Sequence, residues 1–117
     1  MSDSQTKSRV VVICDGLAKS RVPIANTFWS KFMGLMGKDV QEGEDGLFLV
    51  NCSRVHTCFM RSSIDVLYVG ASLQGIEMET LKPWQFGKKV KDARHVLEMP
   101  AGYLAGTAPK SIKLTKI

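Results

Sequence analysis

Short runs of β-branched and aliphatic residues, each bounded by turn residues, recur along the chain. The first two, 9–14 and 17–24, are separated by Asp15-Gly16, a pair typical of a tight hairpin turn. Five later runs end in the same way at glycine, proline or polar residues, and they span 47–50, 64–69, 76–81, 94–99 and 112–116. The pattern therefore predicts seven short strands, of which the fourth and fifth in chain order pair as a second hairpin.

One segment has a helical period instead. Its apolar residues recur at spacings that place them on one side of a helix, namely Phe28, Phe32, Leu35 and Met36. Asn26 or Thr27 can cap the start of this helix, and Gly37 can end it. Seven turn-separated strands without alternating helices favour a mainly β (α+β) fold, which we expect to be a compact antiparallel β-sandwich or open barrel with one amphipathic helix near 27–36.

Length and composition fit one small domain. The 117 residues are 44% hydrophobic and 23% charged, which is ordinary for a folded chain and leaves no room for separate cofactor and substrate domains. Residues 1–8 are polar and predict a flexible N-terminus, so the globular domain is expected to span 9–117. An odd number of cysteines, with no signal segment and no run long enough to cross a membrane, predicts a cytoplasmic protein without a membrane partner.

Charge is uneven along the chain, whose net charge is +5. Of the 16 basic and 11 acidic side chains, residues 1–79 carry 8 and 9, whereas residues 80–117 carry 8 and 2. Basic residues near Trp84 and Phe86 suit phosphate binding and base stacking, which makes weak RNA binding through the basic C-terminal third an alternative function. Because no nucleic-acid-binding motif accompanies this charge, a nucleic-acid partner is not favoured.

The densest polar segment joins the third and fourth predicted strands and contains Cys52, His56, Cys58 and Met60. If this segment is extended, His56, Cys58 and Met60 share one face and offer soft ligands suited to copper(I) or zinc. The two cysteines lack Cys-x-x-Cys spacing, so we expect no metal and no other cofactor. A small cysteine- or metal-dependent hydrolase using Cys52, His56 and Asp65 stays an alternative, although no recognisable nucleophile signature favours it.

Two carboxylates fall within apolar strands. Both faces of the strand that carries Asp65 are apolar, so this carboxylate needs a partner, for which Arg61, His56 or backbone N–H groups are candidates. Glu98 raises the same problem beside Val96. The two carboxylates could be the acid and base of a hydrolase or could anchor loops, and we favour anchors because no second catalytic signature accompanies them.

A longer set of motifs resembles a known family. In order they are Gly34-Leu35-Met36, Gly46-Leu47-Phe48, Val55-His56-Thr57, Phe59-Met60-Arg61, Ile64-Asp65-Val66, Leu81-Lys82-Pro83-Trp84, Ala93-Arg94, Val96-Leu97-Glu98 and Pro100-Ala101-Gly102. Over about residues 25–106 this order resembles the uncharacterised bacterial domain-of-unknown-function family 192. The resemblance implies a compact, mainly β fold with one helix, and it implies no activity. Ser62-Ser63 and residues 107–111 depart from the family pattern, which has a proline at the first place and a Gly-Asp turn at the second.

These observations favour a small non-catalytic binding or interaction domain with a shallow polar pocket for a small ligand, in particular an anionic one. The candidate binding cluster consists of Cys52, His56, Arg61, Asp65, Lys82, Trp84 and Glu98. Arg61 and Lys82 would hold the anion, and Trp84 would contact a flat or apolar part of the ligand. Whether the protein is an enzyme and whether it is oligomeric are left open by the sequence.

Overall fold

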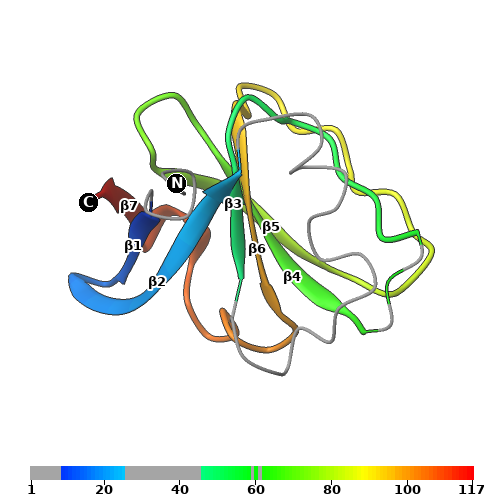
Figure 1. Cartoon of the computed structure of the whole chain (residues 1–117), viewed down its shortest axis with the longest axis horizontal. Helices are drawn as coiled ribbons and strands as arrows, with labels where there is room; N and C mark the ends of the chain where they lie inside the picture. The colour runs from blue at the N-terminus through cyan, green and yellow to red at the C-terminus, as the bar shows by residue number, and fades with distance from the viewer. Residues whose placement is uncertain (1–8, 26–45, 59, 61) are drawn as a thin grey trace, which may run out of the picture.

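The computed structural model describes residues 9–25, 46–58, 60 and 62–117, in which seven strands form one curled sheet shaped like half of a barrel (Figure 1). The strands are β1 (Arg9–Cys14), β2 (Leu17–Ala25), β3 (Leu47–Leu49), β4 (Ile64–Val69), β5 (Gly75–Leu81), β6 (His95–Pro100) and β7 (Ile112–Lys116), and the short 3-10 helix η2 (Pro109–Ser111) precedes β7. All seven predicted strands and the mainly β fold are confirmed. The helix expected near 27–36 and the N-terminal segment 1–8 lie outside the described residues.

The strands lie in the order β5-β4-β6-β3-β2-β1-β7 across the sheet. Among the described strands, β2 and β3 form the one parallel pair, and the other neighbours are antiparallel. Both predicted hairpins are confirmed: β4 pairs with β5, and β1 pairs with β2 across Asp15 and Gly16, whose φ angles of 52° and 84° suit a tight hairpin turn. The last strand lies beside the first, with Lys116 opposite Val10.

Side chains alternate between two faces of the sheet, and both faces of β4 are buried. The face that we call the Glu98 face carries Val66 opposite Glu98 and packs into one hydrophobic cluster. The face that we call the Asp65 face carries Leu67 and packs into a second cluster, which includes residues of β1, β2 and β7. Because β4 has no solvated side, a polar residue on it must find its partners within the protein.

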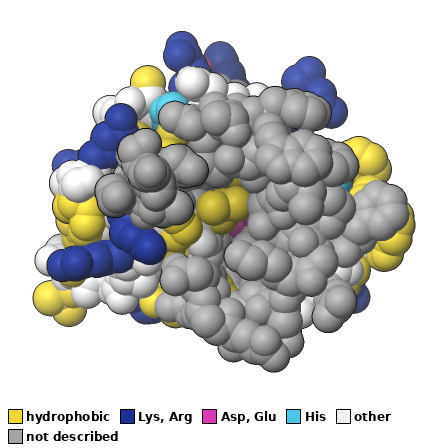
Figure 2. All heavy atoms as spheres, in the orientation of Figure 1, with side chains coloured by type: hydrophobic (Ala, Val, Ile, Leu, Met, Phe, Trp, Pro, Cys, Tyr) yellow, Lys and Arg dark blue, Asp and Glu magenta, His cyan; other side chains and the backbone are white. Residues whose placement is uncertain are grey.

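Basic side chains are prominent around the edge of the face drawn in Figure 2. Lys and Arg side chains project from the periphery of the view in Figure 2, in keeping with the net charge of +5. No helix in the described ranges has the length and apolar character needed to span a membrane.

Candidate functional site

The structure separates the two candidate carboxylates. Asp65 lies opposite Met99 in the β4–β6 pair, and Glu98 lies opposite Val66. Residues directly opposite each other share a face and neighbours along a strand alternate, so Asp65 and Glu98 lie on opposite faces of the sheet. The hypothesis that these two carboxylates act together as acid and base is therefore wrong.

Asp65 is a buried anchor. Its side chain is 4% exposed, and its Oδ1 accepts a hydrogen bond from the Thr80 hydroxyl at 2.7 Å. Its Oδ2 accepts hydrogen bonds from the backbone N–H groups of Gly102 at 3.0 Å and Leu104 at 3.1 Å. The expected backbone partners are confirmed, and Thr80 adds a third donor. These bonds hold the turn after β6 against β4, which is the role of a loop anchor.

Glu98 is buried in a different environment. It is 6% exposed, and its row across β5, β4, β6 and β3 contains Glu79, Val66, Glu98 and Leu47. Among the described residues no hydrogen bond reaches its carboxylate, and burial raises the pKa of this carboxyl from 4.5 to about 7. Near neutral pH both protonation states are populated, so Glu98 can donate as well as accept a proton.

Residues 56–60 do not form the extended segment that would align soft metal ligands. The N–H of Met60 donates to the carbonyl oxygen of Thr57 at 3.1 Å, which closes a turn and leaves His56 exposed and Met60 buried. The expectation that His56, Cys58 and Met60 share one face is wrong because the turn breaks the strand alternation. In the part of the chain that the structure describes, no group of three His, Cys, Asp or Glu side chains could hold a metal.

Cys52 and His56 each bond to backbone atoms close by. The Sγ of Cys52 donates to the carbonyl oxygen of Arg54 at 3.2 Å, and Nδ1 of His56 accepts from the N–H of Cys58 at 3.2 Å. Within the described ranges no hydrogen bond joins Cys52 to His56 or His56 to Asp65. The nucleophile, base and orienting acid that a cysteine hydrolase needs are therefore not assembled among these three residues.

Lys82 and Trp84 lie on a loop that Thr57 holds in place. The buried Thr57 hydroxyl donates to the carbonyl oxygen of Lys82 at 2.5 Å and accepts from the N–H of Gln85 at 2.8 Å. The N–H of Trp84 donates to the Thr57 carbonyl oxygen at 3.0 Å. Arg61, the remaining candidate, lies outside the described residues. Thr57 was not among the candidate site residues. Its position in the motif Val55-His56-Thr57 is the feature of the sequence from which its role could have been predicted.

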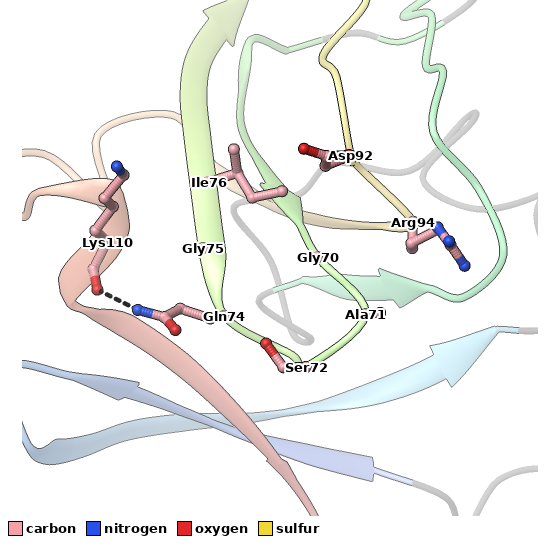
Figure 3. Close-up of a pocket in the computed structure, with 9 residues that line it drawn as sticks. All are labelled: Gly70, Ala71, Ser72, Gln74, Gly75, Ile76, Asp92, Arg94 and Lys110. Atoms are coloured by element: carbon pink, nitrogen blue, oxygen red, sulfur yellow. Dashed lines mark hydrogen bonds between the residues drawn. The ribbon is translucent and has the colours of Figure 1, made fainter.

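A pocket that the sequence did not indicate opens beside the β4–β5 turn (Figure 3). This pocket, here called the hairpin pocket, has a volume of about 500 Å³ and is lined by residues of the turn 70–76 together with Asp92, Arg94 and Lys110. It is shallow and opens widely to solvent. Lys82 and Trp84 do not line it, so the expected ligand-holding residues and this pocket are in different places.

Three segments that are distant in the sequence meet at the hairpin pocket. Gln74 Nε2 donates to the carbonyl oxygen of Lys110 at 3.2 Å, and the N–H of Arg94 donates to the carbonyl oxygen at the end of β4 at 2.8 Å. A Cβ added at Gly75 would lie 2.2 Å from the carbonyl oxygen of Pro109, so only glycine allows this approach of β5 to η2. The pocket walls are therefore fixed by tertiary contacts of the backbone.

Charged groups stand at the rim of the hairpin pocket. Figure 3 shows Lys110 on one side of Gly75, and Asp92 and Arg94 on the other. The Asp92 carboxylate turns toward Ile76, whereas the Arg94 guanidinium is directed outward, and all three charged residues are exposed. Arg94 and Lys110 thus stand on two sides of the rim, and Asp92 is the charged side chain that turns toward Ile76. No local pattern predicts this arrangement, because the approach of η2 to the β4–β5 turn is set by long-range pairing.

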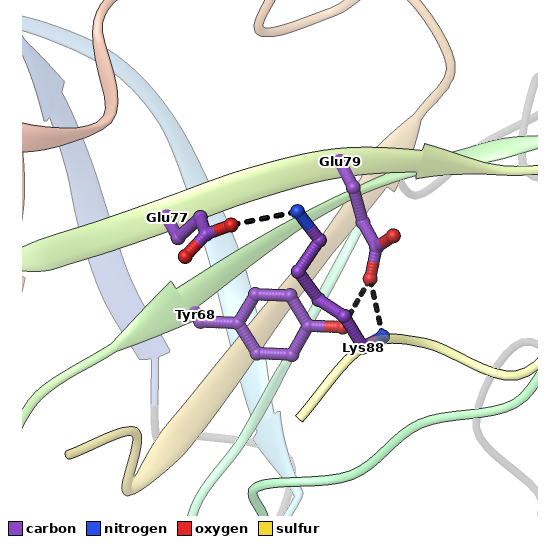
Figure 4. A network of polar contacts seen from close by, with 4 residues as sticks. All are labelled: Tyr68, Glu77, Glu79 and Lys88. Carbon is purple, nitrogen blue, oxygen red and sulfur yellow. Dashed lines mark hydrogen bonds and ion pairs between the residues drawn. The ribbon is translucent and has the colours of Figure 1, made fainter. Parts of the chain in front are cut away.

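A second polar network lies on the Glu98 face (Figure 4). The hydroxyl of buried Tyr68 donates to Glu79 Oε2 at 2.5 Å, the same oxygen accepts from the N–H of Lys88 at 2.8 Å, and Lys88 Nζ pairs with Glu77 at 2.6 Å. Burial and the bond to Glu79 raise the pKa of the Tyr68 phenol well above its ordinary value. A Cβ at Gly87 would lie 2.4 Å from the Tyr68 hydroxyl oxygen. The network therefore ties the loop after β5 closely to the sheet.

A curled, mainly antiparallel seven-stranded sheet with a buried carboxylate on each face defines a small mainly β domain. The chain belongs to the family DUF192, described as uncharacterized ACR, whose family model matches residues 10–110. The resemblance found in the sequence motifs is therefore confirmed.

Curated relatives carry the name UPF0127 protein. The one from Thermococcus sibiricus is 31% identical over 88 residues, which are 72% of this chain and 57% of that protein. The one from Pyrococcus horikoshii is 30% identical over 98 residues, which are 79% of this chain and 83% of that protein. The chain thus spans little more than half the length of the Thermococcus protein. These relatives are archaeal, so the expected restriction of the family to bacteria is too narrow.

Solved structures share the fold. A candidate transcription regulator from Sinorhizobium meliloti 1021 superposes with a TM-score of 0.78 at 17% identity, covering 98% of each chain. A protein of unknown function from Novosphingobium aromaticivorans has a TM-score of 0.74 at 18% identity, covering 92% of this chain and 83% of the other. At these identities the likeness concerns the fold alone.

Proposed function

We propose that this domain is a non-catalytic binding domain and that a small anion, carrying a carboxylate or phosphate group, occupies the hairpin pocket. The observation that carries the proposal is the placement of Arg94 and Lys110 on two sides of one pocket of about 500 Å³. That volume is in the range of small-molecule sites, which combine an apolar lining with a few polar groups. Ile76 supplies the apolar part.

Each charged group of the pocket has a distinct role in this proposal. Arg94 is exposed at the rim, and by turning its guanidinium from the outward direction toward the pocket it would offer a planar pair of donors to a carboxylate or phosphate, while Lys110 adds a point charge. Asp92 repels a second anionic group and favours a ligand with a hydroxyl or amine at that end. The one hydroxyl side chain of the lining, Ser72, has no histidine or cysteine beside it in the lining, which supports binding rather than catalysis.

The cytoplasm is the location that we propose for this binding domain. Cys14, Cys52 and Cys58 form no disulfide bond with one another in the described part of the chain. Free thiols persist in a reducing compartment, whereas small secreted domains commonly oxidise theirs.

The test is an NMR titration of ¹⁵N-labelled full chain with inorganic phosphate and, separately, with citrate. We expect shifts of the amide signals of 70–76, Arg94 and Lys110, and a loss of affinity of about tenfold or more in the double variant Arg94→Ala/Lys110→Ala. The control Arg21→Ala/Lys116→Ala removes two exposed charges outside the pocket and should keep the affinity. Equal weakening in both double variants, or shifts centred elsewhere, would contradict the proposal.

A further inference from the structure

Two loops run side by side at the surface, and neither contributes a residue to the lining of the hairpin pocket (Figure 1). They are residues 51–58 and 82–91, which together we call the two-loop surface. The N–H of Thr57 donates to the carbonyl oxygen of Gln85 at 2.8 Å, and the N–H of Gly87 donates to that of Val55 at 2.9 Å. An isolated bridge also joins His56 to Phe86. These backbone hydrogen bonds join the two loops into one platform.

This platform displays aromatic rings to solvent. Trp84 is 61% exposed and Phe86 is 74% exposed, and the ring of His56 lies 5.9 Å from that of Phe86. Trp84 has a φ of 65°, a left-handed conformation that is costly for a bulky residue. The hydrogen bond from the Trp84 N–H to the Thr57 carbonyl oxygen holds the backbone in this conformation.

The charge of the same two loops is uniformly positive. Residues 51–58 and 82–91 contain five basic side chains and no acidic one, and all five are exposed: Arg54, Lys82, Lys88, Lys89 and Lys91. Lys88 is engaged with Glu77 on β5. Exposed rings and exposed cations therefore occur together on the same two loops, which is a stronger signal than the charge of the C-terminal third alone.

We propose that the two-loop surface binds a single-stranded nucleic acid, whose bases stack on Trp84 and Phe86 and whose phosphates contact the surrounding cations. Aromatic rings stack on every base because each base has a π-face, and a basic groove follows the backbone without reading sequence. A duplex hides its base faces, so it cannot use the rings. Protein interfaces are depleted in lysine, whereas four of the five cations here are lysine, and this favours phosphate over a protein partner.

The first experiment measures fluorescence anisotropy of the full chain with labelled oligouridine and oligothymidine of about 12 nucleotides. We expect both to bind, and a duplex of the same length to bind at least about fivefold more weakly because its bases are not free to stack. Raising the salt from about 50 to about 200 mM should weaken single-strand binding roughly tenfold. The ratio of the two affinities shows whether the surface prefers RNA or DNA.

Variants separate stacking from general attraction. Phe86→Ala and Trp84→Ala should each weaken oligouridine binding by about fivefold or more, since each removes a stacking ring. Leu17→Ala is the matched control, because Leu17 is also 74% exposed but lies in the β1–β2 hairpin. Lys82→Glu/Lys89→Glu should reduce the salt dependence as well as the affinity, while Arg21→Glu should change both less. Circular dichroism verifies that each variant is folded.

Several outcomes would overturn the proposal. These are no binding at low salt, equal binding of duplex and single strand, and ring variants that bind as well as Leu17→Ala. A poly-glutamate peptide that competes with the oligonucleotide at equal charge concentration would show simple attraction to any polyanion. Because Arg94 and Lys110 lie outside the two-loop surface, Lys110→Ala should leave oligonucleotide binding intact, which keeps this site distinct from the hairpin pocket.

Discussion

Asp65 and Glu98 lie in adjacent rows of one sheet and are almost equally buried, but they differ in the hydrogen-bond donors that reach them. On the Asp65 face three donors converge on one carboxylate. On the Glu98 face Val66 and Leu47 flank the carboxylate, and no donor among the described residues reaches it. Burial alone therefore does not reveal the role of an acidic residue. Tertiary pairing brings three donors to Asp65, whereas burial without such donors raises the pKa of Glu98.

Asp65→Ala should have the largest effect on stability. The substitution leaves two backbone N–H groups without an acceptor and releases the turn after β6, so we expect a loss of about 3 to 5 kcal/mol in the free energy of unfolding. Urea denaturation measures this loss. Thr80→Val removes one donor and should cost only about 1 kcal/mol. A loss below about 1 kcal/mol for Asp65→Ala would mean that the anchor is dispensable.

Glu98→Gln should raise the free energy of unfolding instead of lowering it, and only at pH values at which Glu98 of the wild type is ionised. The folded pKa of Glu98, about 7, lies above its ordinary 4.5, so the folded state binds more protons than the unfolded state between these values. Wild-type stability should therefore fall as the pH rises from about 4.5 to 7 and then level off, a loss of about 3 kcal/mol at most.

The glutamine variant lacks this titration. At pH 8 it should be more stable than the wild type, and near pH 4 the two should match, because a protonated Glu and a Gln are both neutral there. Denaturation curves across this pH range give the comparison. If the difference in stability between wild type and Glu98→Gln is the same at pH 4 and pH 8, the ionised Glu98 carboxylate is stabilised in the folded state and this expectation is wrong.

Tyr68→Phe should have the smallest effect of the three. Tyr68 shares the Glu98 face, yet its hydroxyl has an acceptor in Glu79, so this face can satisfy a polar group. Losing that hydrogen bond should cost about 1 to 2 kcal/mol by thermal or urea denaturation. Lys88→Ala removes the exposed pair with Glu77 and should be close to neutral. If Lys88→Ala lost more stability than Tyr68→Phe, the exposed ion pair would contribute more than the buried hydrogen bond, contrary to this prediction.

Much of the fold could be predicted from local sequence. β-branched runs and turn residues place all seven strands, and Asp15-Gly16 predicts the first hairpin. The order of the strands could not be predicted, because β4 beside β6 and the parallel β2–β3 pair bring together residues that are far apart in the sequence. Pairing of this kind depends on the packing of both faces, which no window of a few residues contains.

The candidate site was predictable only in part. The apolar neighbours of Asp65 show that it needs partners, but Thr80 becomes one through the β4–β5 register. The hairpin pocket depends on Lys110 approaching the β4–β5 turn, and nothing near either segment indicates that contact. The alignment of His56, Cys58 and Met60 depended on an extended backbone, and the hydrogen bond from the Met60 N–H to the Thr57 carbonyl oxygen forms a turn there instead.

The pairing of β7 with β1 has a consequence for the order of folding. Val10 lies opposite Lys116, so this edge of β1 has no neighbour in the sheet until β7 has been synthesised. Closing so long a loop is entropically costly, and topologies rich in such distant contacts fold slowly. Until β7 is in place, one edge of the β1–β2 hairpin therefore stays open to pairing with strands of other chains.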